Sequence, residues 1–367
     1  MIPAETVEWL LASDEPAARW IALTRLLGRD LGDPEVVAAH QDVLAHSGTL
    51  DLIGRLGDWD RPEPLSGHAS AAYAPNLLCL LADFGVGPGD NPHVDAAVAA
   101  LTHHADDDGR LASPAIISRI GPEPALSALL CDSHAIVEVL VRFGKGEDPA
   151  ARRALDRMGE DLASTAQGTA WPCVPSRGFR GPGRKGDACP HVTLEALRTI
   201  ALLEPDRRPV SPEDALAAAR TALRFWSHRG ASKPYMFGHG IAFKTVKWPP
   251  FWYGDLAVLE AIGRFPEVWE PGSRDVKAED RTAVVELAAC LLAYNVGADG
   301  RVTPRSCYRG FEAFSFGPKR VPSPYATARV FAALKPFERL APDIARSDVL
   351  ALASSKGGSG LARAPRT

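Results

Sequence analysis

The chain has 367 residues, of which 46% are hydrophobic and 23% are charged, and its formal net charge at pH 7 is −4. This composition is typical of a globular protein and offers no basic surface for a nucleic-acid partner. The six cysteines are too few and too scattered for a disulfide scaffold. The N-terminus does not resemble a signal peptide, and no apolar run approaches the roughly 20 residues that span a membrane. The sequence therefore predicts a soluble, cytoplasmic protein.

The chain is rich in alanine and leucine at helical spacing, and strand signals are nearly absent. Helices are expected in pairs, with Pro/Gly-rich loops between them. The pairing predicts six αα hairpins that repeat every 60 residues or so, roughly twice the length of the common two-helix repeats. In chain order, the expected pairs are 17–27 with 33–46, 68–84 with 91–104, 123–143 with 148–162, 190–203 with 211–228, 253–265 with 278–294, and 324–334 with 344–352.

Similar turns follow several of these pairs. Asp108-Gly109-Arg110 and Asp299-Gly300-Arg301 both come after second helices. A repeat of two helices cannot bury its own apolar face, so neighbouring repeats must stack on it. Six hairpins can close into a ring with the first helices inside, and the predicted fold is therefore an all-α (α/α)6 toroid in residues 1–353, followed by a disordered tail in 354–367. An open helical solenoid has the same sequence pattern and is the alternative.

In a closed ring, the inner helices all begin at one end, and their first residues line one mouth of the tunnel. Polar and titratable side chains recur at these positions. Asp132, His134 and Asp255 are the candidates for acid–base catalysis there. Tyr325, at the start of the last inner helix, is a candidate for substrate contact. The alternative for the aspartates is a plain N-cap, a position that aspartate prefers in any helix.

The stretch Asp187-Ala-Cys189-Pro190 opens one inner helix. A carboxylate and a thiol two residues apart can bind one zinc ion, and the helix N-terminus favours the thiolate. Asp187, Cys189 and His191 are therefore the candidate zinc ligands. The alternatives are an N-cap role for Asp187, a packed thiol at Cys189, and an i,i+4 pair between His191 and Glu195.

Two further segments are candidates for substrate binding. The basic, glycine-rich run 177–186 can receive an anion, and the alternative is a solvated loop. Its candidate residues are Arg180, Arg184 and Lys185. The aromatic connection 233–253 is long enough to cover the mouth of the tunnel, and the alternative is packing against the outer helices. Its candidate residues for an apolar ligand are Tyr235, Trp248, Trp252 and Tyr253.

The sequence Gly178-Phe-Arg-Gly181, then Arg184-Lys185, then Asp187-Ala-Cys189 resembles the β-subunit of the protein prenyltransferases, and the six hairpins resemble the wider terpenoid cyclase and prenyltransferase superfamily. The resemblance implies an α/α toroid, zinc bound by the Asp and the Cys, and an isoprenoid diphosphate held by the basic residues. The family's third zinc ligand, a His after a Tyr, corresponds to Ala326. The candidates to replace it are His191, His134, His239 and Asp255.

The chain is also similar to bacterial proteins called squalene cyclase-like or prenyltransferase-like, a label that states a fold rather than a reaction. Three functional classes follow. The first is a zinc-dependent transferase or cyclase acting on an apolar molecule such as an isoprenoid diphosphate. The second is a metal-free cyclase or isomerase that uses Asp or His as acid and base, and the third is a non-catalytic binding or scaffold protein. Protein prenylation requires an α-subunit that this chain does not contain, so a small apolar or amphiphilic substrate is expected.

Overall fold

A computed structural model gives the structure of the chain and describes residues 1–64, 70–116, 121–173, 186–232, 234 and 237–352. This part is mostly helical with a few short strands, as predicted, and none of its helices is long and apolar enough to cross a membrane. The helices are α1 (Ala4–Leu11), α2 (Pro16–Ile21), α3 (Pro34–Ala45), α4 (Ser47–Gly54), α5 (Ala74–Phe84), α6 (Pro92–Ala100), α7 (Leu130–Arg142), α8 (Pro149–Glu160), α9 (Pro190–Leu202), α10 (Pro212–Ser227), α11 (Ile241–Lys244), α12 (Asp255–Ile262), α13 (Ala278–Asn295), α14 (Pro324–Leu334) and α15 (Ala341–Arg346).

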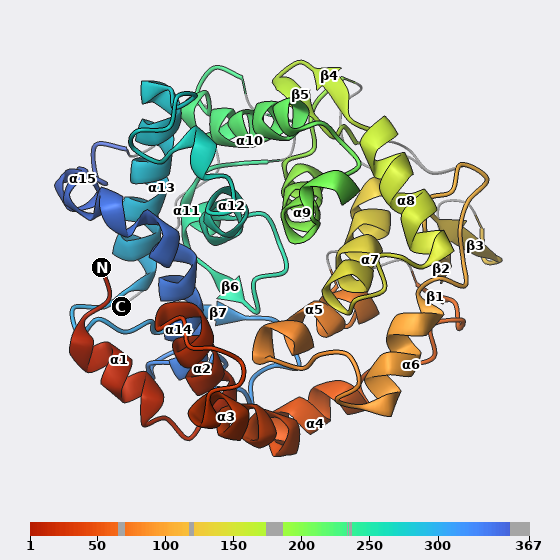
Figure 1. Cartoon of the computed structure of the whole chain (residues 1–367), viewed down its shortest axis with the longest axis horizontal. Coiled ribbons are helices and arrows are strands. Elements are labelled where there is room, and N and C mark those ends of the chain that lie inside the picture. The colour runs from red at the N-terminus through yellow and green to blue at the C-terminus, as the bar shows by residue number, and fades with distance from the viewer. Residues whose placement is uncertain (65–69, 117–120, 174–185, 233, 235–236, 353–367) are drawn as a thin grey trace.

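One set of helices lies around the centre of the molecule and a second set lies outside it (Figure 1). The central helices are α2, α5, α7, α9, α12 and α14. Each packs against the next one in chain order, and α14 packs against α2. Helices α3, α6, α8, α10 and α13 each pack on the outer side of the central helix that precedes them. A π-helical turn, Ala22–Leu26, continues α2 toward its C-terminal end.

The first and last parts of the chain are joined by hydrogen bonds as well as by packing. The carboxylate of Glu15, just before α2, accepts a hydrogen bond from the backbone N–H of Tyr325 in α14 at 3.0 Å. The hydroxyl of Thr6 donates to the carbonyl of Gly300 at 3.3 Å.

The helices begin where the sequence carries a capping residue followed by proline. The side chains of Asp33, Asn91, Asp148 and Ser211 each accept a hydrogen bond from a backbone N–H in the first turn of their helix. Each of them is followed directly by proline, whose missing N–H and fixed φ suit the first helical position. Local sequence therefore sets where these outer helices begin.

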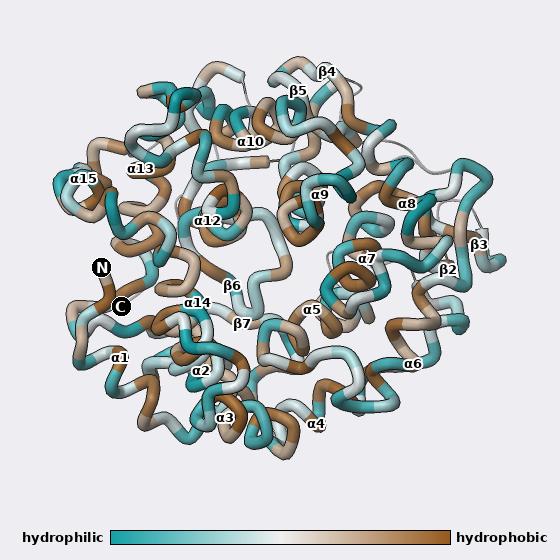
Figure 2. Tube along the Cα trace, in the orientation of Figure 1, coloured by the Kyte–Doolittle hydropathy of each residue, from teal (hydrophilic) through white to brown (hydrophobic). Residues whose placement is uncertain are grey.

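Apolar residues form one continuous core between the two sets of helices. Trp171, Trp226 and Trp248 are fully buried in it. Figure 2 shows hydrophobic residues along helices that border one another and hydrophilic residues in many peripheral loops. Each central helix is thus packed on both flanks and on its outer side, and only one face remains for the centre of the molecule.

Seven short strands connect the helices. They are β1 (Glu63–Pro64), β2 (Ser113–Ile116), β3 (Pro124–Ser127), β4 (Ala163–Thr165), β5 (Gly168–Ala170), β6 (Lys247–Trp248) and β7 (Ser306–Cys307) within the described residues. β3 replaces the first part of the helix predicted for 123–143, because this segment pairs antiparallel with β2. The aromatic connection predicted at 233–253 contains α11 and β6, and β6 pairs in parallel with β7.

The prediction of a helix at 344–352 is wrong for most of that range, since α15 ends at Arg346. The side chain of Asp348 accepts hydrogen bonds from the backbone N–H groups of Leu350 and Ala351 at 3.0 and 3.2 Å. Such local bonds to an aspartate compete with the helical ladder and favour a turn. The last predicted hairpin is accordingly shorter than its five predecessors in the sequence.

The two Asp-Gly-Arg turns have the same backbone arrangement. An antiparallel bridge joins Ala105 to Leu111 around the first turn, and another joins Val296 to Val302 around the second. The glycine in each turn has a positive φ, 87° and 70° respectively, a conformation that glycine adopts without strain. The repeat predicted from the sequence is therefore present in the turns as well as in the helices.

Candidate functional site

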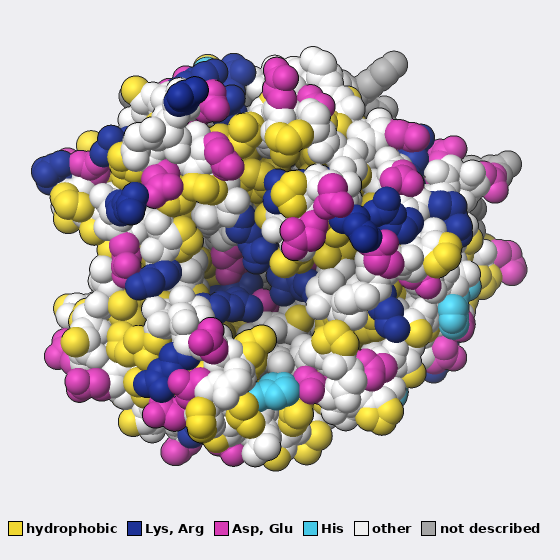
Figure 3. Space-filling view, in the orientation of Figure 1, with side chains coloured by type: hydrophobic (Ala, Val, Ile, Leu, Met, Phe, Trp, Pro, Cys, Tyr) yellow, Lys and Arg dark blue, Asp and Glu magenta, His cyan; other side chains and the backbone are white. Residues whose placement is uncertain are grey.

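A hollow lies at the centre of the face shown in Figure 3, and both basic and acidic side chains are visible inside it. It corresponds to a cavity of about 320 Å³ at the C-terminal part of the central helices. Its charged lining comes from every central helix or from the residues that directly follow one. The lining residues are Arg25, Asp83, Arg142, Arg198, Leu259, Glu260, Gly263, Arg264, Arg329, Ala332, Ala333 and Pro336.

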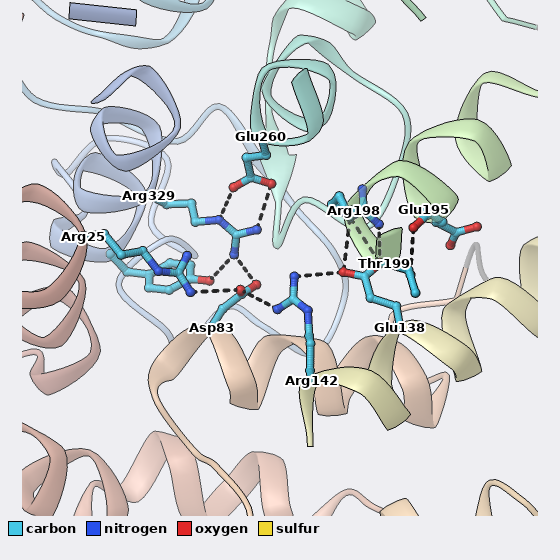
Figure 4. Close-up of polar contacts among 10 residues, drawn as sticks. Arg25, Asp83, Glu138, Arg142, Glu195, Arg198, Thr199, Glu260 and Arg329 are labelled. Carbon is cyan, nitrogen blue, oxygen red and sulfur yellow. Dashed lines mark hydrogen bonds and ion pairs between the residues drawn. The ribbon is translucent and has the colours of Figure 1, made fainter. Parts of the chain in front are cut away.

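Ion pairs connect most of these charged side chains across the cavity (Figure 4). The guanidinium of Arg329 contacts both Asp83 on α5 and Glu260 on α12, with one Glu260 oxygen at 3.0 Å. Arg142 donates to Asp83 at 2.9 Å. Asp83 is thus held by two arginines from two other helices, and the network links α5, α7, α12 and α14.

Glu138 on α7 extends this network toward α9. It lies 2.8 Å from the guanidinium of Arg142 and 2.8 Å from that of Arg198. Burial alone would raise the pKa of Glu138, but Arg198 and Arg142 outweigh burial and lower that pKa to about 2. Burial likewise opposes ionisation of Asp83, and Arg329 and Arg142 hold its pKa well below the ordinary value. Both carboxylates are therefore charged at neutral pH.

The arginines outnumber the carboxylates. Five arginines line the cavity, against Asp83, Glu260 and the adjoining Glu138 among the described residues. The guanidinium of Arg264 forms no ion pair or hydrogen bond with any residue of the described chain, and that of Arg25 lies 3.6 Å from Asp83. Burial and the nearby Arg142 lower the pKa of Arg264. The cavity thus carries excess positive charge on side chains that an added anion can reach.

The sequence contains a signal for this cluster, which is a regular spacing of charged residues rather than a short motif. Arg25, Asp83, Arg142, Arg198, Arg264 and Arg329 follow one another at intervals of 56 to 66 residues, one in each helical repeat. Each of these charged residues lies in a central helix or within a few residues after one. A charged residue recurring once per repeat on the inner helices therefore marks the lining of the central cavity.

A second cavity, of about 50 Å³, shares five charged residues with the first and lies nearer the N-terminal ends of the central helices. His191, Glu195 and Trp252 line it on the other side. His191 Nε2 lies 3.2 Å from the Glu195 carboxylate, and the His191 ring stacks on Trp252 with ring centroids 4.7 Å apart. The volume is too small for more than a water or two. Side chains therefore nearly fill the space between the N-terminal parts of the central helices at this second cavity.

The predicted zinc ligands have other interactions in the structure. Asp187 accepts a hydrogen bond from Gln167 at 3.2 Å, and His191 pairs with Glu195 as the alternative interpretation predicted. Cys189 is buried, and burial raises the pKa of its thiol to about 12 despite hydrogen bonds from the helix N-terminus. The expectation that the helix start favours the thiolate is thus outweighed by desolvation. Within the described residues, no group of three or more His, Cys, Asp and Glu is arranged to hold a metal ion.

The three predicted acid–base residues are buried at the N-terminal parts of the central helices. Asp132 accepts a hydrogen bond from Ser127 at 2.9 Å. His134 Nδ1 lies 3.4 Å from the carbonyl of Val192, and burial lowers the pKa of His134 to about 4. Burial raises the pKa of Asp255 well above its ordinary value, and Lys244 only partly opposes this shift. None of the three lines the arginine-rich cavity.

The predicted aromatic ligand contacts are mostly packed in the core. Trp248 is fully buried against Phe316 and Tyr325, and the Tyr253 hydroxyl lies 2.9 Å from His239 Nε2. The Tyr325 hydroxyl accepts a hydrogen bond from Arg329 at 3.1 Å and so holds a residue that lines the cavity. Trp252, with 41% of its surface exposed, remains available for contact. Four predicted residues lie outside the described residues, namely Arg180, Arg184, Lys185 and Tyr235.

No model of a protein family matches the sequence, and a search of curated proteins gives no match. The resemblance to the prenyltransferases and terpenoid cyclases therefore depends on the motifs and the hairpin repeat alone.

Proposed function

We propose that the chain is an (α/α)6 toroid that binds a small anionic molecule in its central cavity. The ring closure is supported by the contacts of each central helix with the next and of α14 with α2. The binding proposal is carried by one observation, the excess of arginines in a cavity of about 320 Å³. Ligand pockets in proteins begin at about this volume.

Arginine is suited to this role because its planar guanidinium binds carboxylates and phosphates through two parallel hydrogen bonds. Arg25 and Arg264 are the natural first contacts, since neither is neutralised by close acidic partners on both sides. Arg142, Arg198 and Arg329 are fixed by their ion pairs and provide a rigid positive wall. The walls also contain an apolar patch made by Leu259, Ala332 and Pro336, which can contact a hydrocarbon part of the ligand.

Among the three predicted functions, this proposal favours a binding protein. It assigns the anion to the arginines of the central cavity instead of the basic run 177–186. It retains an amphiphilic small molecule as the ligand. An isoprenoid diphosphate is one such molecule, and the motif resemblance is the reason to test it. No catalytic step is assigned to the cavity.

A zinc-dependent transferase or cyclase is the second candidate function. It is favoured by one local feature, the antiparallel bridge between Pro172 and Ala188, which places Cys173 opposite Asp187 and within electrostatic range of the Cys189 thiol. Metal analysis of protein purified without chelators is the test. About one zinc per chain, lost in Cys189→Ala, would support this candidate, and full metal content in that variant would exclude the site.

The anion proposal is tested by isothermal titration calorimetry of the full chain with sulfate, methyl phosphate and geranyl diphosphate at constant ionic strength. We expect binding of at least one of these anions at about 1 mM, which corresponds to about −4 kcal/mol. Arg264→Gln should weaken it by about 1.5–3 kcal/mol, the range for hydrogen bonds to charged groups. Arg339→Gln is the matched control, because Arg339 is exposed and pairs with Glu270 away from the cavity. Absence of binding by all three anions refutes the proposal.

A further inference from the structure

The number of charged side chains around the cavity indicates how many negative charges its ligand carries. Five arginines face Asp83, Glu138 and Glu260, and the described residues around the cavity therefore carry two more positive than negative charges. The three carboxylates are each held by an arginine at hydrogen-bond distance. Arg264 has no ion pair with a described residue, and the ion pair of Arg25 with Asp83, at 3.6 Å, is the longest of those at the cavity.

We infer that the central cavity binds an organic dianion, a molecule with two negative charges carried by a phosphate monoester or by two carboxylates. This inference rests on the proposed function and narrows it to a ligand class. A single negative charge would leave one positive charge of the cavity without a counter-charge, whereas a third would exceed the excess positive charge. Two negative charges neutralise the cavity.

The shape of the cavity requires an organic part on this dianion. A volume of about 320 Å³ corresponds to roughly ten water molecules at about 30 Å³ each, far more than a bare phosphate or sulfate occupies. Leu259, Ala332 and Pro336 provide an apolar wall beside the arginines. A ligand that fills the site therefore places its charged group on Arg25 and Arg264 and its hydrocarbon part on this wall.

The arrangement also explains why Arg264 has no ion pair with a described residue and why Arg25 contacts Asp83 only at 3.6 Å. Arg264 is exposed at the cavity, where Arg142 and Arg25 repel its guanidinium and Glu138 and Glu260 attract it. A bound dianion would convert this repulsion into attraction, because both arginines can then donate to the same charged group. The free chain keeps this part of the network incomplete, and the ligand completes it.

The test compares ligands that differ by one charge at the same pH. Methyl phosphate is largely a dianion at pH 7.5, since phosphate monoesters have a second pKa of about 6, and dimethyl phosphate is a monoanion of similar size. Succinate and butyrate form the corresponding pair of carboxylates. We expect the dianion of at least one pair to bind the full chain at least about tenfold more tightly than its monoanion, and phenyl phosphate to bind more tightly than methyl phosphate. Whichever pair shows this preference identifies the source of the two charges.

Arg264→Gln provides the second arm of the experiment. This substitution removes one positive charge and no ion pair of the described chain, so the network should remain folded. We expect it to reduce the preference for the dianion to about threefold or less, while Arg339→Gln leaves the preference unchanged. Equal binding of monoanions and dianions would overturn the dianion inference and leave anion binding intact. Absence of binding by every probe would overturn both, and an unchanged preference in Arg264→Gln would remove Arg264 from the site.

Discussion

Arg329 and Asp83 are 246 residues apart in the chain and form a buried ion pair across the centre of the molecule. Arg329 belongs to α14, the last central helix, and Asp83 to α5, so the pair spans helices that are not neighbours in the sequence. Glu260 and Arg142 hold the two partners from their other sides. The pair is therefore the centre of the network that lines the cavity.

Replacing one partner of this pair should destabilise the fold strongly. In Arg329→Met, both Asp83 and Glu260 lose a buried partner, and breaking a buried pair on one side costs about 3–5 kcal/mol. Urea unfolding followed by circular dichroism measures the loss. Arg339→Met, at an exposed surface pair, should change the free energy of unfolding by less than about 1 kcal/mol. Equal stability of the two variants would show that the central network does not contribute to folding.

Much of the helical architecture follows from the sequence alone. The apolar period located the central and outer helices, and capping residues such as Asp33 and Asp148 fixed where the outer helices begin. The segment 124–127 was misassigned because its alternation of small and apolar residues suits a helix and a strand equally. Its strand conformation comes from pairing with β2, a partner that local sequence does not reveal.

The candidate site was harder to predict than the fold. A charged residue on a helix usually faces solvent, so Arg142 and Arg198 gave no sign in the sequence of lining a cavity; the packing of the central helices on one another places them there. The interval of 56 to 66 residues between successive charged positions is the feature that does reveal them. The prediction that the helix N-terminus favours the Cys189 thiolate was wrong, because desolvation by the surrounding core outweighs the field of the helix and raises the pKa of the thiol.

Gly159 in α8 and Gly54 in α4 should respond differently to replacement by alanine. A Cβ added at Gly159 in α8 would lie 2.2 Å from the backbone carbonyl oxygen of Pro209, whereas one added at Gly54 in α4 would meet no atom within 4 Å. Gly159→Ala should therefore cost about 1–3 kcal/mol through overpacking. Gly54→Ala should be neutral or stabilise by up to about 1 kcal/mol, because alanine loses less entropy in a helix. Chemical denaturation of both variants checks this difference, and a stable Gly159→Ala would contradict the packing of α8 on the 205–209 segment.

His134 should make the free energy of unfolding depend on pH between about 4 and 6.5. Burial lowers the pKa of His134 to about 4, so between these values the unfolded chain binds the proton that the folded chain excludes. Stability from this residue is present above pH 6.5 and is lost as the pH falls toward 4, by an amount on the order of 2–3 kcal/mol. His134→Gln, measured by urea unfolding from pH 4.5 to 7.5, should remove this rise. Parallel curves for the variant and the wild type would show that His134 is not buried as a neutral ring.

Glu15 should produce the opposite dependence over an overlapping range. Burial raises the pKa of Glu15 to about 7, against hydrogen bonds from Ser315 and from the N–H of Tyr325. Between pH 4.5 and 7 the folded chain therefore holds a proton that the unfolded chain releases, and the free energy of unfolding falls as the pH rises through this window. Glu15→Gln retains an acceptor for the Tyr325 N–H and carries no charge, so it should abolish that fall.

The two residues have opposing effects between about pH 4.5 and 6.5, and the wild-type stability should accordingly change little there. Each single variant then exposes the slope of the other residue: Glu15→Gln should become more stable as the pH rises, and His134→Gln less stable. Because Glu15 accepts a hydrogen bond from the start of α14, the pH dependence that it causes also reports on the contact between α2 and α14. A flat profile in Glu15→Gln would contradict the burial assigned to His134, and a flat profile in His134→Gln would contradict the contact between Glu15 and the start of α14.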